Sequence, residues 1–263
     1  MKPHHRLLTA ALAVLATTAA TKVRADDPPA PPPPEHTWIG KGQLGFLESK
    51  GNSNAESING NVDFTRYDDP WKNELYLAYL YGKNSSVVSA ERFEAREQTN
   101  YNIASNVFVF GGLRYEHDLF DGFEFQRSIS AGLGYKIFDN KITALSVQAG
   151  AGYRQTRPET LNYDSNGNGE VVSRIPLVQT NEAIGSLEID FMHKFNEATT
   201  LTNKLYGESG STNTMAQDQV QLAVKMTTKL ALVLGYRIID NTDPAPGLKK
   251  VDQLTTVNLQ FSF

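Results

Sequence analysis

The chain has 263 residues with 25 Lys and Arg, 29 Asp and Glu and no Cys, which gives a formal net charge of −4 at pH 7. This length allows one large β domain, and the absence of Cys excludes a disulfide scaffold and thiol chemistry. Beyond the first 25 residues, no apolar run approaches the roughly 18 residues that a membrane helix needs. A transmembrane β-barrel stays open to this chain, because only every second residue of such a strand faces lipid.

The amino terminus is typical of an export signal. Lys2 and Arg6 precede the apolar segment Leu7–Ala20, and we predict a signal peptide over residues 1–25 with cleavage after Ala25. Cleavage after Ala20 is the alternative. A buried core helix is disfavoured, because a Pro-rich segment follows at once. The predicted signal peptide contains four basic residues, so the mature chain has 21 basic and 29 acidic residues, a net charge of about −8. This charge argues against nucleic acid as a partner.

Residues 26–37 contain the run PPAPPPP. Such a run favours extended polyproline II, and proline cannot donate a hydrogen bond to a sheet. We predict a periplasmic spacer here. A recognition motif for a periplasmic partner is the alternative.

Residues 38–263 alternate between apolar and polar side chains, which is typical of strands with two different faces. In the final strand, Val257, Leu259 and Phe261 share one face, and Asn258 and Gln260 share the other. Twelve segments are predicted as strands: Ile39–Glu48, Ser57–Tyr67, Trp71–Lys83, Ala90–Ile103, Val107–Asp118, Phe123–Ile137, Ile142–Gln155, Glu182–Phe195, Thr199–Glu208, Gln217–Thr228, Lys229–Ile239 and Val251–Phe263. A long polar loop, Thr156–Thr180, separates the seventh strand from the eighth.

These strands predict an all-β fold, a single antiparallel transmembrane β-barrel of about twelve strands in up-and-down meander order. The number is even, short turns alternate with mostly longer loops, and the charged residues share the polar face. Aromatic side chains cluster at strand ends, where interface girdles would lie: Trp71, Tyr81, Phe108, Tyr115, Phe123, Tyr135, Phe138, Tyr153 and Phe195. A soluble β-sandwich or lipocalin-like barrel is the alternative, since its strands would alternate too.

The polar face carries charges of both signs. The candidate lumen or pore-lining residues are Glu94, Arg96, Arg114, Glu124, Lys136, Arg154, Glu188, Asp190, Lys204 and Lys225. A barrel of this size encloses modest space once side chains fill it. Mixed charges can line a narrow polar pore or form a salt-bridged plug, and the sequence leaves both interpretations open.

Catalytic and metal chemistry have weaker signals. The mature chain has three histidines, His36, His117 and His193, and we find no nucleophile-bearing motif around them. We therefore predict no catalytic residues. Asp164, Asn166 and Asn168 resemble the first half of a calcium loop, but the twelfth position is an isoleucine. A hairpin tip rich in Asn and Gly is the alternative, and we expect no other cofactor.

Several motifs resemble a bacterial family of salt-induced outer membrane proteins, a domain of unknown function. They are GQLGF at 42–46, GNSNAES at 51–57, GLRYEHDLFDGFEFQRSISAGLGYKIFD at 112–139, AGAGYRQTR at 149–157 and DPAPGLKKVDQLTTVNLQFSF at 243–263. The resemblance implies a barrel in the bacterial outer membrane. The terminal strand, with Phe261 and Phe263, is similar to the signal that barrel-assembly machinery binds.

We expect a non-enzymatic outer-membrane protein of the salt-induced type, either a narrow polar channel or a structural component under envelope stress. A lipid-modifying enzyme of the outer membrane is the alternative, and a soluble periplasmic ligand-binding barrel is the third hypothesis. Expected partners are outer-membrane lipid, the assembly machinery and lipopolysaccharide, whose phosphates Lys249 and Lys250 could contact. An ordinary solvated loop is the other interpretation of these two lysines, and the oligomeric state stays open.

Overall fold

The computed structural model describes residues 37–49, 55–84, 87–119, 121–164, 170–244 and 248–263. The predicted signal peptide, residues 26–36 of the spacer and the hairpin at 50–54 lie outside the described residues. Within the described ranges, no helical segment combines the length and the hydropathy of a membrane span.

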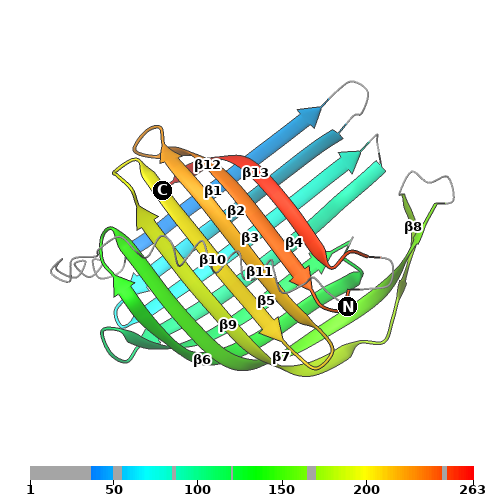
Figure 1. Ribbon diagram of the computed structural model, residues 1–263, viewed down its shortest axis with the longest axis horizontal. Coiled ribbons are helices and arrows are strands. Elements are labelled where there is room, and N and C mark those ends of the chain that lie inside the picture. The colour runs from blue at the N-terminus through cyan, green and yellow to red at the C-terminus, as the bar shows by residue number, and fades with distance from the viewer. Residues whose placement is uncertain (1–36, 50–54, 85–86, 120, 165–169, 245–247) are drawn as a thin grey trace, which may run out of the picture.

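The described chain is built from strands that pair with their neighbours in sequence (Figure 1). They are β1 Thr37–Ser49, β2 Ala55–Asp68, β3 Trp71–Asn84, β4 Val87–Asn102, β5 Val107–Asp118, β6 Phe123–Asp139, β7 Thr143–Tyr163, β8 Val171–Pro176, β9 Thr180–Lys194, β10 Thr199–Ser209, β11 Thr214–Lys225, β12 Leu230–Asn241 and β13 Val251–Ser262. All except β8 form one antiparallel ring, which the pairing of β1 with β13 closes. The predicted all-β meander of twelve barrel strands is confirmed.

The five turns at one end of the barrel have two to four residues, and the two longest connections, 164–179 and 242–250, lie at the other end, as in outer-membrane barrels. We call the end with turns 69–70, 103–106, 140–142, 195–198 and 226–229 the periplasmic end, and the opposite end the extracellular end. Asparagine fixes two of these turns: Oδ1 of Asn140 accepts from Thr143 N, and Oδ1 of Asn196 accepts from Thr199 N. Such side-chain caps allow a strand to reverse within a few residues.

The apolar and polar faces of the strands lie where the alternation predicts. Val257, Leu259 and Phe261 of β13 are 44–59% exposed on the outside, whereas Asn258 is 2% exposed on the inside. Large apolar side chains are exposed on the other barrel strands except β10, where Leu201 and Leu205 are half-buried. A soluble protein rarely exposes so much contiguous apolar surface, and a lipid-facing wall accounts for it.

The extracellular end differs from the prediction at residues 156–180. Instead of a loop, β7 continues to Tyr163, and β8 pairs with its last residues to form a hairpin beyond the ring (Figure 1). Arg174 Nη1 contacts Glu159 Oε1 at 3.1 Å, and Asn162 Nδ2 donates to Ser173 Oγ at 2.9 Å. Strands outside the membrane need no apolar face, so the alternation that identified the other strands is missing here.

Two aromatic side chains assigned to the interface girdles lie elsewhere. Phe108 is 4% exposed and Phe123 is 9% exposed, so neither forms part of an outer girdle. Phe108 and Phe110 share the inward face of β5 with Arg114, and a Cβ on Gly134 would collide with the Phe108 ring. A Cβ on Gly150 would lie 2.9 Å from Cζ of Phe110. Glycines on β6 and β7 therefore leave room for two aromatic rings inside the barrel.

Candidate functional site

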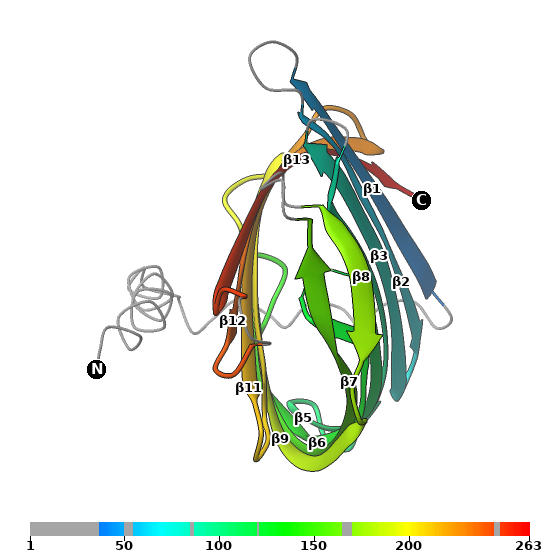
Figure 2. The same cartoon turned by 90° about the vertical axis from the view of Figure 1, so that its right-hand side faces the viewer.

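The interior is polar and is the candidate functional site. Figure 2 shows β1, β2 and β3 facing β9, β11 and β12 across the interior. Alternate residues of each strand point inward, so β4 and β5 each contribute several charged side chains. Those of β4 and β5, with one from β12, form what we call the Glu94 cluster: Arg92, Glu94, Arg96, Arg114, Glu116, Asp118 and Arg237.

Four guanidinium groups surround the carboxylate of Glu94, which is 1% exposed. The nitrogen-to-oxygen distances are 3.2 Å for Arg96, 3.4 Å for Arg92, 3.5 Å for Arg114 and 3.8 Å for Arg237. The cluster contains four guanidinium groups and three carboxylates. It therefore has one more positive charge than negative charge.

Arg237 reaches Glu94 from the opposite wall, because β12 and β4 are separated by β13, β1, β2 and β3 in the ring. The other three arginines come from β4 and β5 themselves. The pair of Glu94 and Arg237 is thus the contact of this cluster that crosses the lumen.

Arg154 organises a second cluster near the extracellular end. Its guanidinium lies 2.6 Å from Glu182 and 3.5 Å from Glu208. Arg154 is 1% exposed and Glu208 is 0% exposed. Ser128 Oγ of β6 donates to Glu208 of β10 at 2.6 Å, which forms another bridge across part of the lumen.

Lys204 organises a third cluster on β9 and β10. Its Nζ lies 3.0 Å from both Glu188 and Asp190. The amide of Gln148 donates to Glu188 at 3.2 Å and also pairs with Gln98 of β4, with two distances of 3.0 and 3.1 Å. The third cluster is therefore connected to the opposite side of the lumen through neutral amides.

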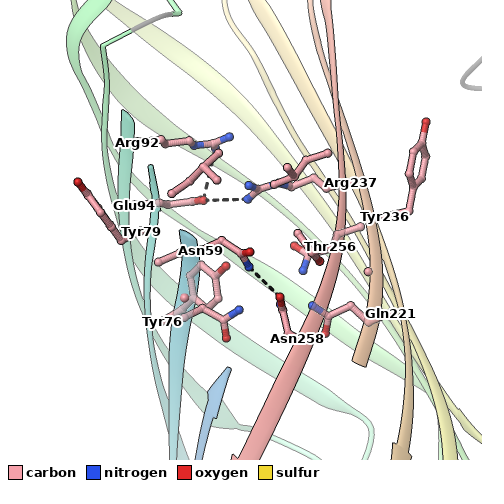
Figure 3. Close-up of a pocket in the computed structure, with 17 residues that line it drawn as sticks. Asn59, Tyr76, Tyr79, Arg92, Glu94, Gln221, Tyr236, Arg237, Thr256 and Asn258 are labelled. Atoms are coloured by element: carbon pink, nitrogen blue, oxygen red, sulfur yellow. Dashed lines mark hydrogen bonds and ion pairs between the residues drawn. The ribbon is translucent and has the colours of Figure 1, made fainter. Parts of the chain in front are cut away.

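A cavity of about 40 Å³ lies beside the Glu94 cluster, between β2–β4 and β11–β13. Figure 3 shows Glu94 and Arg237 approaching each other, with the Asn59–Asn258 hydrogen bond of 2.9 Å near them. Tyr79 and Tyr236 point away from the interior in the same view. The volume has room for a few water molecules, since one needs about 10–15 Å³. The lumen is narrow and filled by paired polar side chains around this space.

The structure brings together seven of the ten candidate lumen residues: Glu94, Arg96, Arg114, Arg154, Glu188, Asp190 and Lys204. The other three lie near strand ends. Glu124 pairs with Arg157 at 3.0 Å near the extracellular end, Lys136 pairs with Asp139 at 3.5 Å near the periplasmic end, and Lys225 is exposed at the end of β11.

The candidate set lacked six charged residues of the clusters: Arg92, Glu116, Asp118, Glu182, Glu208 and Arg237. Glu182 and Glu208 share the faces of Glu188 and Lys204, so extending the alternation along β9 and β10 would have found them. Arg237 had no such signal. Its neighbours on the inward face, Ala231, Val233 and Gly235, are not polar side chains.

The two histidines of the barrel lie at opposite ends. His117 lies near the extracellular end of β5, with Nδ1 against the backbone oxygen of Glu124. His193 lies near the periplasmic end of β9, where Nδ1 is 2.9 Å from Thr143 Oγ1 and its ring stacks on Phe191. In the described part of the chain, neither ring has a hydrogen-bonded carboxylate to orient it as a catalytic base.

The predicted calcium loop is only partly described. The backbone nitrogen of Asp164 donates to Glu170 O at 2.8 Å, while Asn166 and Asn168 lie outside the described residues. Within the described ranges, no three His, Asp or Glu residues are arranged to hold a metal ion. Calcium binding stays a prediction.

A family model described as "Protein of unknown function, DUF481" matches residues 42–263. No curated protein matches the chain. Among solved structures, the translocator domain of the autotransporter NalP from Neisseria meningitidis has a TM-score of 0.49 and 11% identity, covering 97% of this chain and 96% of that one. The NanC porin has a TM-score of 0.48 and 10% identity, covering 86% and 98%. The COG4313 outer membrane channel from Pseudomonas putida F1 has a TM-score of 0.46 and 10% identity, covering 92% and 99%.

Proposed function

This chain belongs to the DUF481 family, whose function is unknown, and we propose that it is a non-enzymatic, narrow channel of the bacterial outer membrane for small anionic solutes. The contact between Glu94 and Arg237 closes the lumen at rest. The proposal rests on a membrane-type barrel with a polar interior and on the ion pair of Glu94 with Arg237 between opposite walls.

The contact of Glu94 with Arg237 is suited to opening. At 3.8 Å it is the longest of the four ion pairs of Glu94, and the carboxylate keeps three other guanidinium groups when Arg237 moves away. A carboxylate that stays paired avoids the free energy cost of an isolated buried charge. Opening therefore costs less here than it would at a lone ion pair.

The interior next to the contact favours anions that keep part of their hydration. The Glu94 cluster has an excess of one positive charge, and the adjacent cavity is lined by amides, including Asn59, Asn61, Gln219 and Gln221. Amides can replace water around a polar solute, and a positive lining in a narrow space raises the local concentration of anions.

Planar-bilayer conductance of the refolded chain tests this function. We expect small discrete current steps with anion selectivity in the wild type, and steps several-fold larger in Arg237→Ala. Arg66→Ala is the matched control, because Arg66 pairs with Asp68 at 2.9 Å near the periplasmic end and its side chain is 41% exposed. That variant should conduct like the wild type.

Silent bilayers for both the wild type and Arg237→Ala, with folding confirmed by the heat-dependent gel mobility of barrels, would refute the channel. The protein would then be a sealed structural barrel. Cation selectivity with normal steps would refute the solute class alone.

A further inference from the structure

The outer wall of the barrel carries a groove over β3–β7 with a volume of about 380 Å³. Its walls are formed mainly by apolar and aromatic side chains: Leu75, Ala95, Leu113, Tyr115, Ile129 and Tyr153. Leu113 and Ile129 are 54% and 57% exposed, so the groove faces outward and not into the lumen. Its size falls within the roughly 300–1,000 Å³ of small-molecule sites.

One edge of the groove carries a cation. Arg127 follows the extracellular start of β6 by four residues and is exposed on the outer face. Its Nε donates to Gln155 Oε1 at 2.7 Å, and its guanidinium lies 5.4 Å from the centroid of the Phe125 ring. Among the described residues no carboxylate forms an ion pair with Arg127. Gln155 and Phe125 thus position a guanidinium whose charge is not neutralised by a carboxylate of the described residues.

Between Leu75 and Leu113, the wall of the groove also carries an acceptor. Glu97 is half-buried on β4, with β5 between it and Arg127. Thr99 Oγ1 donates to Glu97 Oε1 at 2.8 Å, and no cation forms an ion pair with this carboxylate in the described ranges. A polar group on a lipid-facing wall is costly and is a candidate functional residue for that reason.

We propose that this groove binds a phosphorylated glycolipid of the outer leaflet. An acyl chain lies between the apolar walls, a phosphate pairs with Arg127, and a hydroxyl or amide N–H of the lipid donates to Glu97. The two charges favour this occupant. The phosphate pairs with Arg127, which a hydrocarbon chain alone would leave unpaired, and the hydroxyl or amide donors of the lipid pair with Glu97. The residues that carry this proposal, Arg127, Glu97 and Ala95, lie on the outer face and belong to none of the lumen clusters. Arg96, Arg114 and Ser128 also line the groove, but their side chains belong to the inward face of the same strands.

Native mass spectrometry of the folded chain in detergent tests the site, with purified lipid A and its dephosphorylated form as probes. We expect Arg127→Gln to weaken lipid A binding about tenfold or more, the effect of one charge-assisted hydrogen bond. We expect Ala95→Leu to weaken it too, by filling the groove while leaving both charges in place. The wild type should bind dephosphorylated lipid A more weakly than lipid A. The Arg127→Gln variant should bind the two forms equally.

Lys83→Gln is the matched control, because Lys83 is a cation at the extracellular end of β3, outside the groove, with Nζ 5.5 Å from the centroid of the Tyr81 ring. It should bind lipid A like the wild type. Unchanged binding by Arg127→Gln or by Ala95→Leu, with both variants folded by gel mobility, would overturn the proposal. So would a wild type that binds both forms of the lipid equally, or a groove occupied by a second copy of the chain in the mass spectrum.

Discussion

Arg154 holds Glu182 at 2.6 Å, and this pair also fixes an extracellular loop. Glu182 accepts hydrogen bonds from the backbone nitrogen and the Oγ1 of Thr212, both at 2.8 Å, and Arg154 Nη2 donates to the backbone oxygen of Asn213 at 2.5 Å. A single buried guanidinium thus links the lumen wall to the loop that joins β10 and β11.

Arg154→Met should destabilise the barrel by about 3–5 kcal/mol, because it leaves Glu182 and Glu208 buried without their cation. Urea unfolding in lipid vesicles measures this change. Arg157→Met is the control, since the Arg157–Glu124 pair is about two-fifths exposed and should contribute no more than about 1 kcal/mol. Similar losses for the two variants would contradict the assignment of Arg154 as the organising cation.

Glu94→Gln should destabilise the barrel more than Arg237→Gln does. The first change leaves four guanidinium groups facing each other with one carboxylate fewer, whereas the second leaves Glu94 with three partners. We expect about 3–5 kcal/mol for Glu94→Gln, again measured by urea unfolding. Equal losses would show that Glu94 depends on the cross-lumen contact, which would argue against an easily opened pair.

Gly134→Leu should destabilise the barrel because its side chain would occupy the space of the Phe108 ring. Overpacking of this kind costs typically about 1–3 kcal/mol. Phe108→Ala combined with Gly134→Leu should restore much of the loss, and unfolding midpoints of the three variants measure this. If the channel proposal holds, Phe108→Ala alone should also increase conductance. No recovery in the double variant would show that the leucine collides with backbone as well.

Asp121 should make stability depend on pH. Burial, together with the nearby carboxylates of Asp118, Glu116 and Asp252, raises the pKa of Asp121 from 3.8 to about 8. Between about pH 4 and pH 8 the folded state keeps this proton and the unfolded chain does not, so stability falls as pH rises through that window. Above it the contribution is constant.

Asp121→Asn should therefore flatten the decline in the unfolding midpoint between acid and mildly alkaline pH. The same residue accepts from Asn241 Nδ2 at 3.5 Å, so the loop between β5 and β6 contacts β12 at the extracellular end. An unchanged pH profile in Asp121→Asn would show that the proton is held elsewhere.

The fold could be predicted because the apolar and polar faces of a barrel strand are visible in the sequence of that strand alone. Val257, Leu259 and Phe261 of β13 alternate with polar residues, and no other part of the chain is needed to see it. The hairpin of β7 and β8 was not predicted. Its strands have water on both sides, so apolar and polar side chains need not alternate along them.

The site was only partly predictable. The inward face of a strand can be read from its sequence, which is why Glu94 and Arg154 were found. The partner of Glu94 on β12 is fixed by the curvature of the closed ring and lies 143 residues further along the chain. Phe108 faces inward because glycines on β6 and β7 make room for it, and this depends on which strands become neighbours.

The seam between β1 and β13 has a consequence for how the barrel enters the membrane. Gly40 and Phe263 exchange two backbone hydrogen bonds of 2.8 and 2.9 Å, and the Phe263 ring lies over Gly40 and against Phe64. Gln43 and Gln260, 217 residues apart, are hydrogen-bonded in the same seam. Until these distant strands pair, each has an edge of unpaired backbone N–H and C=O groups. Such an edge can pair with strands of other chains in water, and its unpaired groups cost several kcal/mol each in lipid. Closure of this seam removes both edges at once, and a side chain at position 40 would oppose it by colliding with the Phe263 ring.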